Sequence, residues 1–173
     1  PKKLILIEKD NDLFFKLKKN FQKDNILFLN QDALNFEYDK IINFKIISNL
    51  PYNISSKFIF KILKLNKNIN EIICMIQSEL ADKLDYSKGK MNKYKFFCKY
   101  CSDFEIKFKV SPNVFYPKPK VYSKLVKFKI KKNKIENDKL NYFIKFFFIN
   151  KRKIIKSNKY FKDKIDLNHS NMR

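Results

Sequence analysis

The stretch "SNLPYNISS", residues 48–56, decides how the chain folds around it. It follows the apolar segment "FKII" and precedes "KFIFKILKL", in which apolar residues recur at helical spacing. This order predicts a strand that ends in Asn49 and turns through Pro51 into a helix. Ser55 or Ser56 is the predicted N-cap of that helix. A strand, a tight turn and a helix in succession are typical of an α/β protein.

Similar units lie on both sides of this stretch. Short apolar runs at residues 4–8 ("LILIE"), 26–29 ("ILFL") and 71–77 ("EIICMIQ") are predicted to be buried strands. The segment "DNDLFFKLKKNF" (10–21) is predicted to form an amphipathic helix, and "SELADKL" (78–84) a short one. The alternation of strands and helices predicts a mostly parallel sheet.

The pattern changes beyond Gly89. "FEIKFKV" (104–110) and "LVKFKI" (125–130) alternate between apolar and polar residues, which predicts an antiparallel pair at one end of the sheet. Four apolar side chains of the first of these strands are predicted to share one face: Phe104, Ile106, Phe108 and Val110. Three prolines between the two strands, in "SPNVFYPKPK" (111–120), exclude a helix and predict an extended loop.

The charge of the chain indicates a polyanionic partner. Lys and Arg number 39 against 17 Asp and Glu, a formal net charge of +22 over 173 residues. This excess favours a nucleic acid over an anionic membrane, although an AT-rich genome would also enrich lysine. No apolar run is long enough for a membrane span, so no membrane partner is expected.

The three cysteines indicate a reducing compartment rather than a disulfide scaffold. Cys98 and Cys101 have C-x-x-C spacing, but no second pair accompanies them and the single histidine, His169, is distant in sequence. No metal site is therefore predicted.

Three acceptor side chains follow three successive predicted strands. Glu8, Asp32 and Asn49 each lie at a strand's carboxyl end, where open α/β sheets bind ligands. Two acids in these places suit a nucleoside, one for the ribose hydroxyls and the other for the adenine amine. The alternative is that each is an ordinary turn residue.

The motifs also carry a family resemblance. "NLPY" is similar to the (Asn/Asp)-Pro-Pro-(Tyr/Phe) motif of amino-methyltransferases, and "SNLPYNISS" resembles the ribosomal RNA adenine dimethyltransferases, the KsgA and Dim group. Further blocks of the chain resemble the same family in the same order: "LIEKD", "LNQDAL", "MIQSELADKL", "VSPNVFYPKPKVYSKLVKF" and "FFFINKRKIIKSN".

The resemblance implies a Rossmann-like class I methyltransferase fold, with a mostly parallel sheet and antiparallel end strands. Residues 1–132 would form part of the S-adenosyl-L-methionine-dependent domain, and residues 133–173 a small helical segment that contacts RNA. Glu8 would hold the cofactor ribose, and Asp32, with Ala33 beside it, the cofactor adenine. Asn49 would lie between cofactor and substrate.

The resemblance implies a catalytic role for the turn. The Asn49 side-chain oxygen and the Leu50 carbonyl would accept the two protons of an adenine amine and turn its lone pair toward the methyl group. Pro51 sets the backbone φ of the turn and removes a competing donor. Tyr52 would stack on the flipped base, and Phe115 would form the opposite wall.

The predicted activity is N6-dimethylation of adjacent adenines in small-subunit ribosomal RNA, as a step of ribosome biogenesis. The partner would be ribosomal RNA or the immature small ribosomal subunit, bound by a monomer in a bacterial cytoplasm; an organelle stays open because the true N-terminus is not seen. Six basic residues are the predicted RNA contacts: Lys118, Lys120, Lys151, Arg152, Lys153 and Lys156.

Two alternatives remain. One is the related large-subunit methyltransferase that confers macrolide resistance, and the other is a non-catalytic RNA- or DNA-binding factor on the same fold. The sequence also departs from the family pattern. Its Gly-rich cofactor loop would precede Pro1 and is absent, so this chain alone is expected to bind cofactor weakly and to be weakly active or inactive. Lys9, Lys95 and Tyr122 replace an apolar residue, a glycine and an aspartate.

Overall fold

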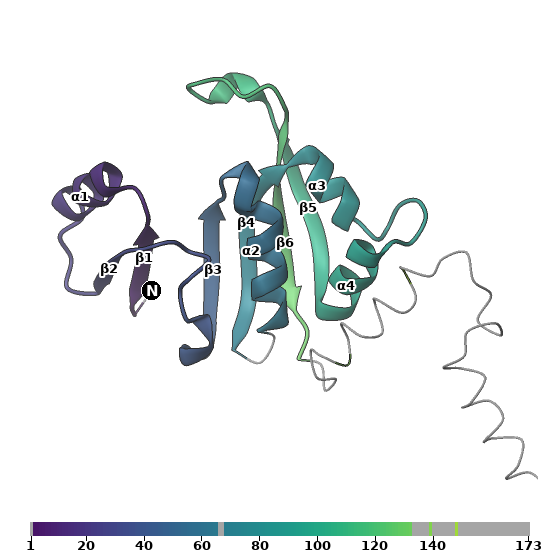
Figure 1. Ribbon diagram of the computed structural model, residues 1–173, viewed down its shortest axis with the longest axis horizontal. Coiled ribbons are helices and arrows are strands. Elements are labelled where there is room, and N and C mark those ends of the chain that lie inside the picture. The colour runs from purple at the N-terminus through teal and green to yellow at the C-terminus, as the bar shows by residue number, and fades with distance from the viewer. Residues whose placement is uncertain (1, 66–67, 133–138, 140–147, 149–173) are drawn as a thin grey trace, which may run out of the picture. The chain divides into compact units, whose positions relative to one another are not determined.

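The computed structural model describes residues 2–65, 68–132, 139 and 148. Nearly all of these lie in one compact unit, made of residues 1–89 and 94–133. Within it, strands and helices alternate and the strands form two hydrogen-bonded sheets (Figure 1). The α/β class predicted from the sequence is confirmed.

The first sheet is a parallel pair. Strand β1 (Leu4–Glu8) leads through helix α1 (Asn11–Asn20) into strand β2 (Ile26–Asn30), and β1 and β2 pair in register from Leu4↔Ile26 to Glu8↔Asn30. Asp10 caps α1, because its side chain accepts the backbone N–H of Leu13 at 2.9 Å. The predicted strand–helix–strand unit is thus present.

The second sheet has four strands in the order β3-β4-β6-β5. Strand β3 (Phe44–Asn49) is parallel to β4 (Ile69–Gln77), whereas β6 (Ser123–Ile130) is antiparallel to both β4 and β5 (Ser102–Val110). The antiparallel end predicted from the alternating segments is therefore confirmed. In the described part of the chain, the pairs β1–β2 and β3–β4 are parallel, and the two antiparallel pairs lie together at one end of the second sheet.

Three helices accompany the second sheet. They are α2 (Tyr52–Lys64), α3 (Ser78–Leu84) and α4 (Lys93–Cys101), with short 3₁₀ turns at Tyr38–Lys40 and Pro112–Val114. The sequence reading missed α4, whose segment "KYKFFCKYC" is rich in aromatic and β-prone residues. Burial decides the conformation there, because Phe97, Cys98 and Cys101 are all buried.

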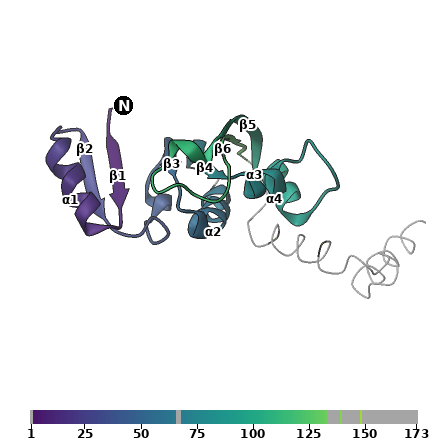
Figure 2. The same ribbon diagram turned by 90° about the horizontal axis from the view of Figure 1, so that it is seen from above.

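The core lies between α2 and the second sheet. Figures 1 and 2 show α2 running along one face of the strands. Each fully buried aliphatic or aromatic side chain contributes about 1.5–3 kcal/mol, so this face stabilises the strand–turn–helix unit strongly. The side chains buried here come from α2, β4 and β6: Phe58, Ile59, Ile62, Leu63, Ile72, Ile76, Val126 and Phe128.

The predicted helix cap at Ser55 or Ser56 is wrong. Helix α2 begins at Tyr52, and Pro51 is its N-cap with φ −55° and ψ 137°. The Ser55 hydroxyl instead donates to the Pro51 carbonyl at 2.8 Å, from inside the first turn. Proline suits the start of a helix because it has no N–H to leave unpaired.

The prediction that four apolar residues of β5 share one face is also wrong. Ile106 pairs with Val126, but Phe108 pairs with Leu125, so Lys107 is an extra residue in a β-bulge. Since Leu125 and Val126 point to opposite faces, the bulge moves Phe108 and Val110 away from the face of Ile106. Phe108 is accordingly 57% exposed.

Candidate active site at the end of strand β3

The turn after β3 presents Asn49 at the carboxyl end of a parallel strand. Asn49 pairs with Met75 of β4 and its side chain is exposed, whereas Leu50 is buried. The backbone N–H groups of Ile54 and Ser55 donate to the Pro51 carbonyl, at 3.2 and 3.1 Å. These two first-turn N–H groups are therefore bonded to the Pro51 carbonyl and not to the Leu50 carbonyl.

Tyr52 is held by a contact that the sequence did not reveal. Its hydroxyl lies 2.8 Å from the Ser123 hydroxyl at the start of β6, and Ser123 is fully buried. Ser123 in turn pairs with Gln77, the last residue of β4. The half-buried Tyr52 is therefore anchored to β6, which lies beside β4 in the second sheet.

The proline-containing loop between β5 and β6 carries the other residues predicted near the turn. Ser111 begins it and accepts the Asn113 N–H at 3.3 Å, and Phe115 donates its N–H to the Pro112 carbonyl at 3.2 Å. Phe115 is half-buried, whereas Lys118 and Lys120 are exposed. The extended, non-helical loop predicted from the prolines is present, apart from the 3₁₀ turn at Pro112–Val114.

The structure brings the two predicted cofactor acids to the same end of the first sheet. Glu8 pairs with Asn30 at the ends of β1 and β2, and one Glu8 carboxylate oxygen accepts the Asp10 N–H at 2.8 Å. Asp32 follows two residues after β2, with the half-buried Ala33 next to it. Asn49 ends a strand of the other sheet.

Asp32 already has two partners in this structure. Its Oδ1 accepts the Leu34 N–H at 2.8 Å, and its Oδ2 forms an ion pair with Lys9 Nζ at 3.0 Å. The Leu34 hydrogen bond and the Lys9 contact both lower the pKa of Asp32 below its usual value, so the carboxylate is charged at neutral pH. Each carboxylate oxygen can accept more than one hydrogen bond, so the group retains capacity for a ligand.

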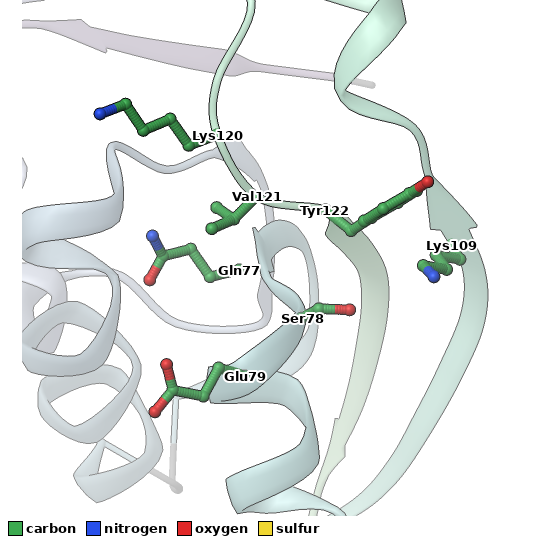
Figure 3. Close-up of a pocket in the computed structure, with 7 residues that line it drawn as sticks. All are labelled: Gln77, Ser78, Glu79, Lys109, Lys120, Val121 and Tyr122. Atoms are coloured by element: carbon green, nitrogen blue, oxygen red, sulfur yellow. The ribbon is translucent and has the colours of Figure 1, made fainter.

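A pocket lies where β4 ends, opposite the start of β6. It has a volume of about 380 Å³. Figure 3 shows that its lining comes from three segments: the β4–α3 junction, the end of β5 and the loop before β6. We call it the Tyr122 pocket, and its lining residues are Gln77, Ser78, Glu79, Lys109, Lys120, Val121 and Tyr122. Of these residues, the sequence analysis predicted a functional role only for Lys120. Tyr122, which replaces an aspartate of the family pattern, could have drawn attention to this pocket.

The three buried cysteines are expected to be unreactive. Cys74, Cys98 and Cys101 are free thiols, and burial raises the pKa of each to about 12. No cluster of three His, Cys, Asp or Glu side chains that could hold a metal ion occurs among the described residues. In the same part of the chain, no helix is both long and apolar enough to cross a membrane.

The predicted C-terminal RNA contacts lie outside the described residues. These are Lys151, Arg152, Lys153 and Lys156, together with the helical segment predicted for 133–173. Their role stays a prediction.

Comparison with known proteins decides the family. A family profile described as "Ribosomal RNA adenine dimethylase" matches residues 1–171. The chain belongs to this family.

Curated members of the family align along most of the chain. A ribosomal RNA small subunit methyltransferase A from Malacoplasma penetrans is 40% identical over 164 residues, which cover 91% of this chain and 59% of the relative. A protein of the same name from Ureaplasma urealyticum is 33% identical over 170 residues, covering 90% and 60%. The chain thus spans about three fifths of the length of these relatives.

Solved structures of similar fold support the same architecture. A dimethyladenosine transferase from Plasmodium falciparum superposes with a TM-score of 0.79 at 24% identity, over 98% of this chain and 65% of that one. The 23S rRNA methyltransferase ErmE gives 0.70 at 23% identity, over 82% and 58%. The Rossmann-like methyltransferase fold expected from the resemblance is therefore confirmed.

Proposed function

We propose that this chain carries the catalytic turn of an S-adenosyl-L-methionine-dependent enzyme that dimethylates N6 of adjacent adenines in small-subunit ribosomal RNA, as a step of ribosome biogenesis. The observation that carries the proposal is the turn from Asn49 to Tyr52, in which an exposed asparagine ends a parallel strand and an anchored tyrosine follows three residues later. The names of the curated relatives support the small subunit as the target.

The turn supplies what transfer to an adenine amine needs. The amine lone pair is delocalised into the ring, so it becomes available only when the nitrogen turns tetrahedral. The Asn49 oxygen and the Leu50 carbonyl accept the two N6 protons and favour that geometry. Positive charge would develop on the nitrogen among these oxygens as the methyl group passes to it, and one N6 proton would then be released to water.

The aromatic groups hold the target base beside the turn. Tyr52 is half-buried and its hydroxyl contacts that of Ser123, so the position of its side chain is fixed at both ends before a base arrives. Phe115 forms the opposite wall from the loop between β5 and β6. A base flipped out of its stack is typically held between such side chains.

Glu8, Asp32 and Ala33 form the cofactor side of the proposed site. A carboxylate can accept both hydroxyls of a ribose, and Glu8 has one carboxylate oxygen beyond the one bonded to Asp10. Asp32 is charged and directed by the Leu34 N–H, which suits contact with an adenine amine. These two hydrogen-bond acceptors therefore fit S-adenosyl-L-methionine, which supplies an electrophilic methyl group when bound.

The proposed partner is the immature small ribosomal subunit, approached by a monomer in the bacterial cytoplasm. Exposed Lys118 and Lys120 in the loop between β5 and β6 would contact phosphates, and Lys151, Arg152, Lys153 and Lys156 would add the contacts predicted in the C-terminal segment.

The test is replacement of Asn49 by Ala in the natural protein that carries this chain. Losing one preorganised partner of a developing charge typically lowers a rate by about 10²- to 10³-fold. We expect a loss of that size in single-turnover methylation of undermethylated small subunits, with little change in RNA binding. Asn70→Ala is the matched control, because Asn70 is an exposed asparagine near the start of β4, at the opposite end of the strands.

If Asn49→Ala methylates at the parent rate, the turn is only structural and the proposed role of Asn49 is wrong. If the parent protein itself methylates no RNA, the non-catalytic RNA-binding alternative replaces the proposal. If methylation appears in 23S but not in small-subunit RNA, the large-subunit alternative is correct.

A further inference from the structure

The Tyr122 pocket lies directly beside the proposed target-base site. Gln77 of the pocket pairs with Ser123, and the Ser123 hydroxyl contacts Tyr52 at 2.8 Å. The Ser78 N–H donates to the Tyr122 carbonyl at 2.9 Å, which ties the loop before β6 to the start of α3. A strand of RNA with its target base at Tyr52 would therefore place a neighbouring nucleotide near this pocket.

The bulge in β5 places Lys109 in the lining of this pocket. Because Lys107 is the extra residue, Lys109 pairs with Lys124 and lies on the face that Tyr122 also occupies, one residue before β6. Lys109 Nζ lies 3.8 Å from the centroid of the Tyr122 ring, a close cation–π contact. Figure 3 shows the two side chains next to each other.

The lining groups match the parts of a nucleotide. Tyr122 is 47% exposed, and a base can stack on the face of its ring opposite Lys109. Lys109 and Lys120, which also line the pocket, provide positive charge for phosphate. The one acidic group, Glu79, is paired with Lys83 at 2.6 Å, which offsets its repulsion of phosphate.

We infer that the Tyr122 pocket is a second nucleotide subsite, which binds the base and phosphate of a single-stranded RNA nucleotide flanking the target adenine. The inference rests on the proposed function for the identity of the strand. It adds a contact that positions the strand and does not itself take part in methyl transfer.

The experiment measures RNA binding rather than methylation. The probe is a fluorescein-labelled single-stranded RNA of eight nucleotides with two adjacent adenines at its centre, followed by anisotropy at several salt concentrations. Tyr122→Ala should weaken binding by roughly 5- to 150-fold, the loss of one stacked base, whereas Tyr122→Phe should bind like the parent. Lys109→Gln should reduce the slope of log affinity against log salt by about 0.7.

Two control variants separate a local effect from a general one. Phe15→Ala removes an aromatic ring that is 65% exposed on α1, and Lys99→Gln removes a lysine that lies 5.9 Å from the Tyr86 ring centroid in a similar cation–π pair. Both should bind RNA like the parent. A loss equal to that of Tyr122→Ala in either control would mean nonspecific binding and would overturn the inference.

Abasic nucleotides locate the contact. An abasic residue moved along the probe should weaken binding to the parent most at one position beside the central adenines, and should cost Tyr122→Ala nothing further there. Unchanged affinity in both Tyr122→Ala and Lys109→Gln refutes the subsite, and leaves the methyltransferase proposal to the Asn49 test. Conversely, a protein that shows the Tyr122 effect but methylates no adenine retains the subsite and loses the proposed function.

Discussion

The hydroxyl pair between Tyr52 and Ser123 gives a prediction whose size follows from burial. Ser123 is fully buried and its hydroxyl lies 2.8 Å from that of Tyr52, which is only half-buried. Tyr52→Phe leaves the buried Ser123 hydroxyl without this partner, which should lower the free energy of unfolding by about 1–3 kcal/mol. Ser123→Ala leaves a tyrosine hydroxyl that can reach water, so its expected cost is about 0.5–1.5 kcal/mol.

The double variant tests the reasoning. With both hydroxyls gone, no buried polar group remains unpaired, so the loss should be about 1 kcal/mol smaller than the sum of the single losses. The measurement is urea unfolding of the four proteins, read as a shift in midpoint at constant slope. Tyr116→Phe is the matched control, since Tyr116 is fully exposed and its hydroxyl faces water. Single losses that add within about 0.5 kcal/mol would refute the coupling.

The remaining predictions concern binding. In the natural protein that carries this chain, Glu8→Ala and Asp32→Ala should each weaken S-adenosyl-L-methionine binding by about 1.5–3 kcal/mol in calorimetry, because each removes hydrogen bonds to a charged group; unchanged affinity in both folded variants would contradict the assignment. Replacing the predicted C-terminal contacts by Gln should flatten the salt dependence of ribosomal RNA binding by about 0.7–0.9 per phosphate contact. The same number of Gln substitutions at exposed lysines of α1 and its flank should leave the salt dependence unchanged. If both sets of substitutions give the same slope, the C-terminal basic residues are exposed to solvent and contact no phosphate. The residues of these two sets are Lys151, Arg152, Lys153 and Lys156, and Lys16, Lys18, Lys19 and Lys23.

Local patterns predicted the elements of this fold well. The strands at 4–8 and 44–49 and the helix at 78–84 occur as predicted, because an apolar run bounded by polar residues or an amphipathic period leaves few alternatives. The strand at 71–77 begins only two residues earlier, at Ile69. Helix α4 was missed because its aromatic residues favour a strand in isolation, and only burial against the rest of the chain selects the helix.

For the candidate site, the sequence by itself determined which chemical groups follow each strand. Glu8, Asp32 and Asn49 end up at or just after strand ends, because side-chain order along a strand is a local property. The anchoring of Tyr52 was decided elsewhere. It depends on Ser123, 71 residues away, which β6 brings close only by pairing with β4.

The contact between Lys109 and Tyr122 in the Tyr122 pocket could not be predicted from the sequence, because it depends on how β5 pairs with β6. Read as a regular strand, "FEIKFKV" puts Lys109 on the face opposite Ile106, and nothing local shows that Lys107 is an extra residue. The register is decided by what β5 must pair with in β6, since a shift of one residue exchanges the two faces of a strand. That shift places Lys109 against Tyr122, and no pattern within either segment predicts this contact.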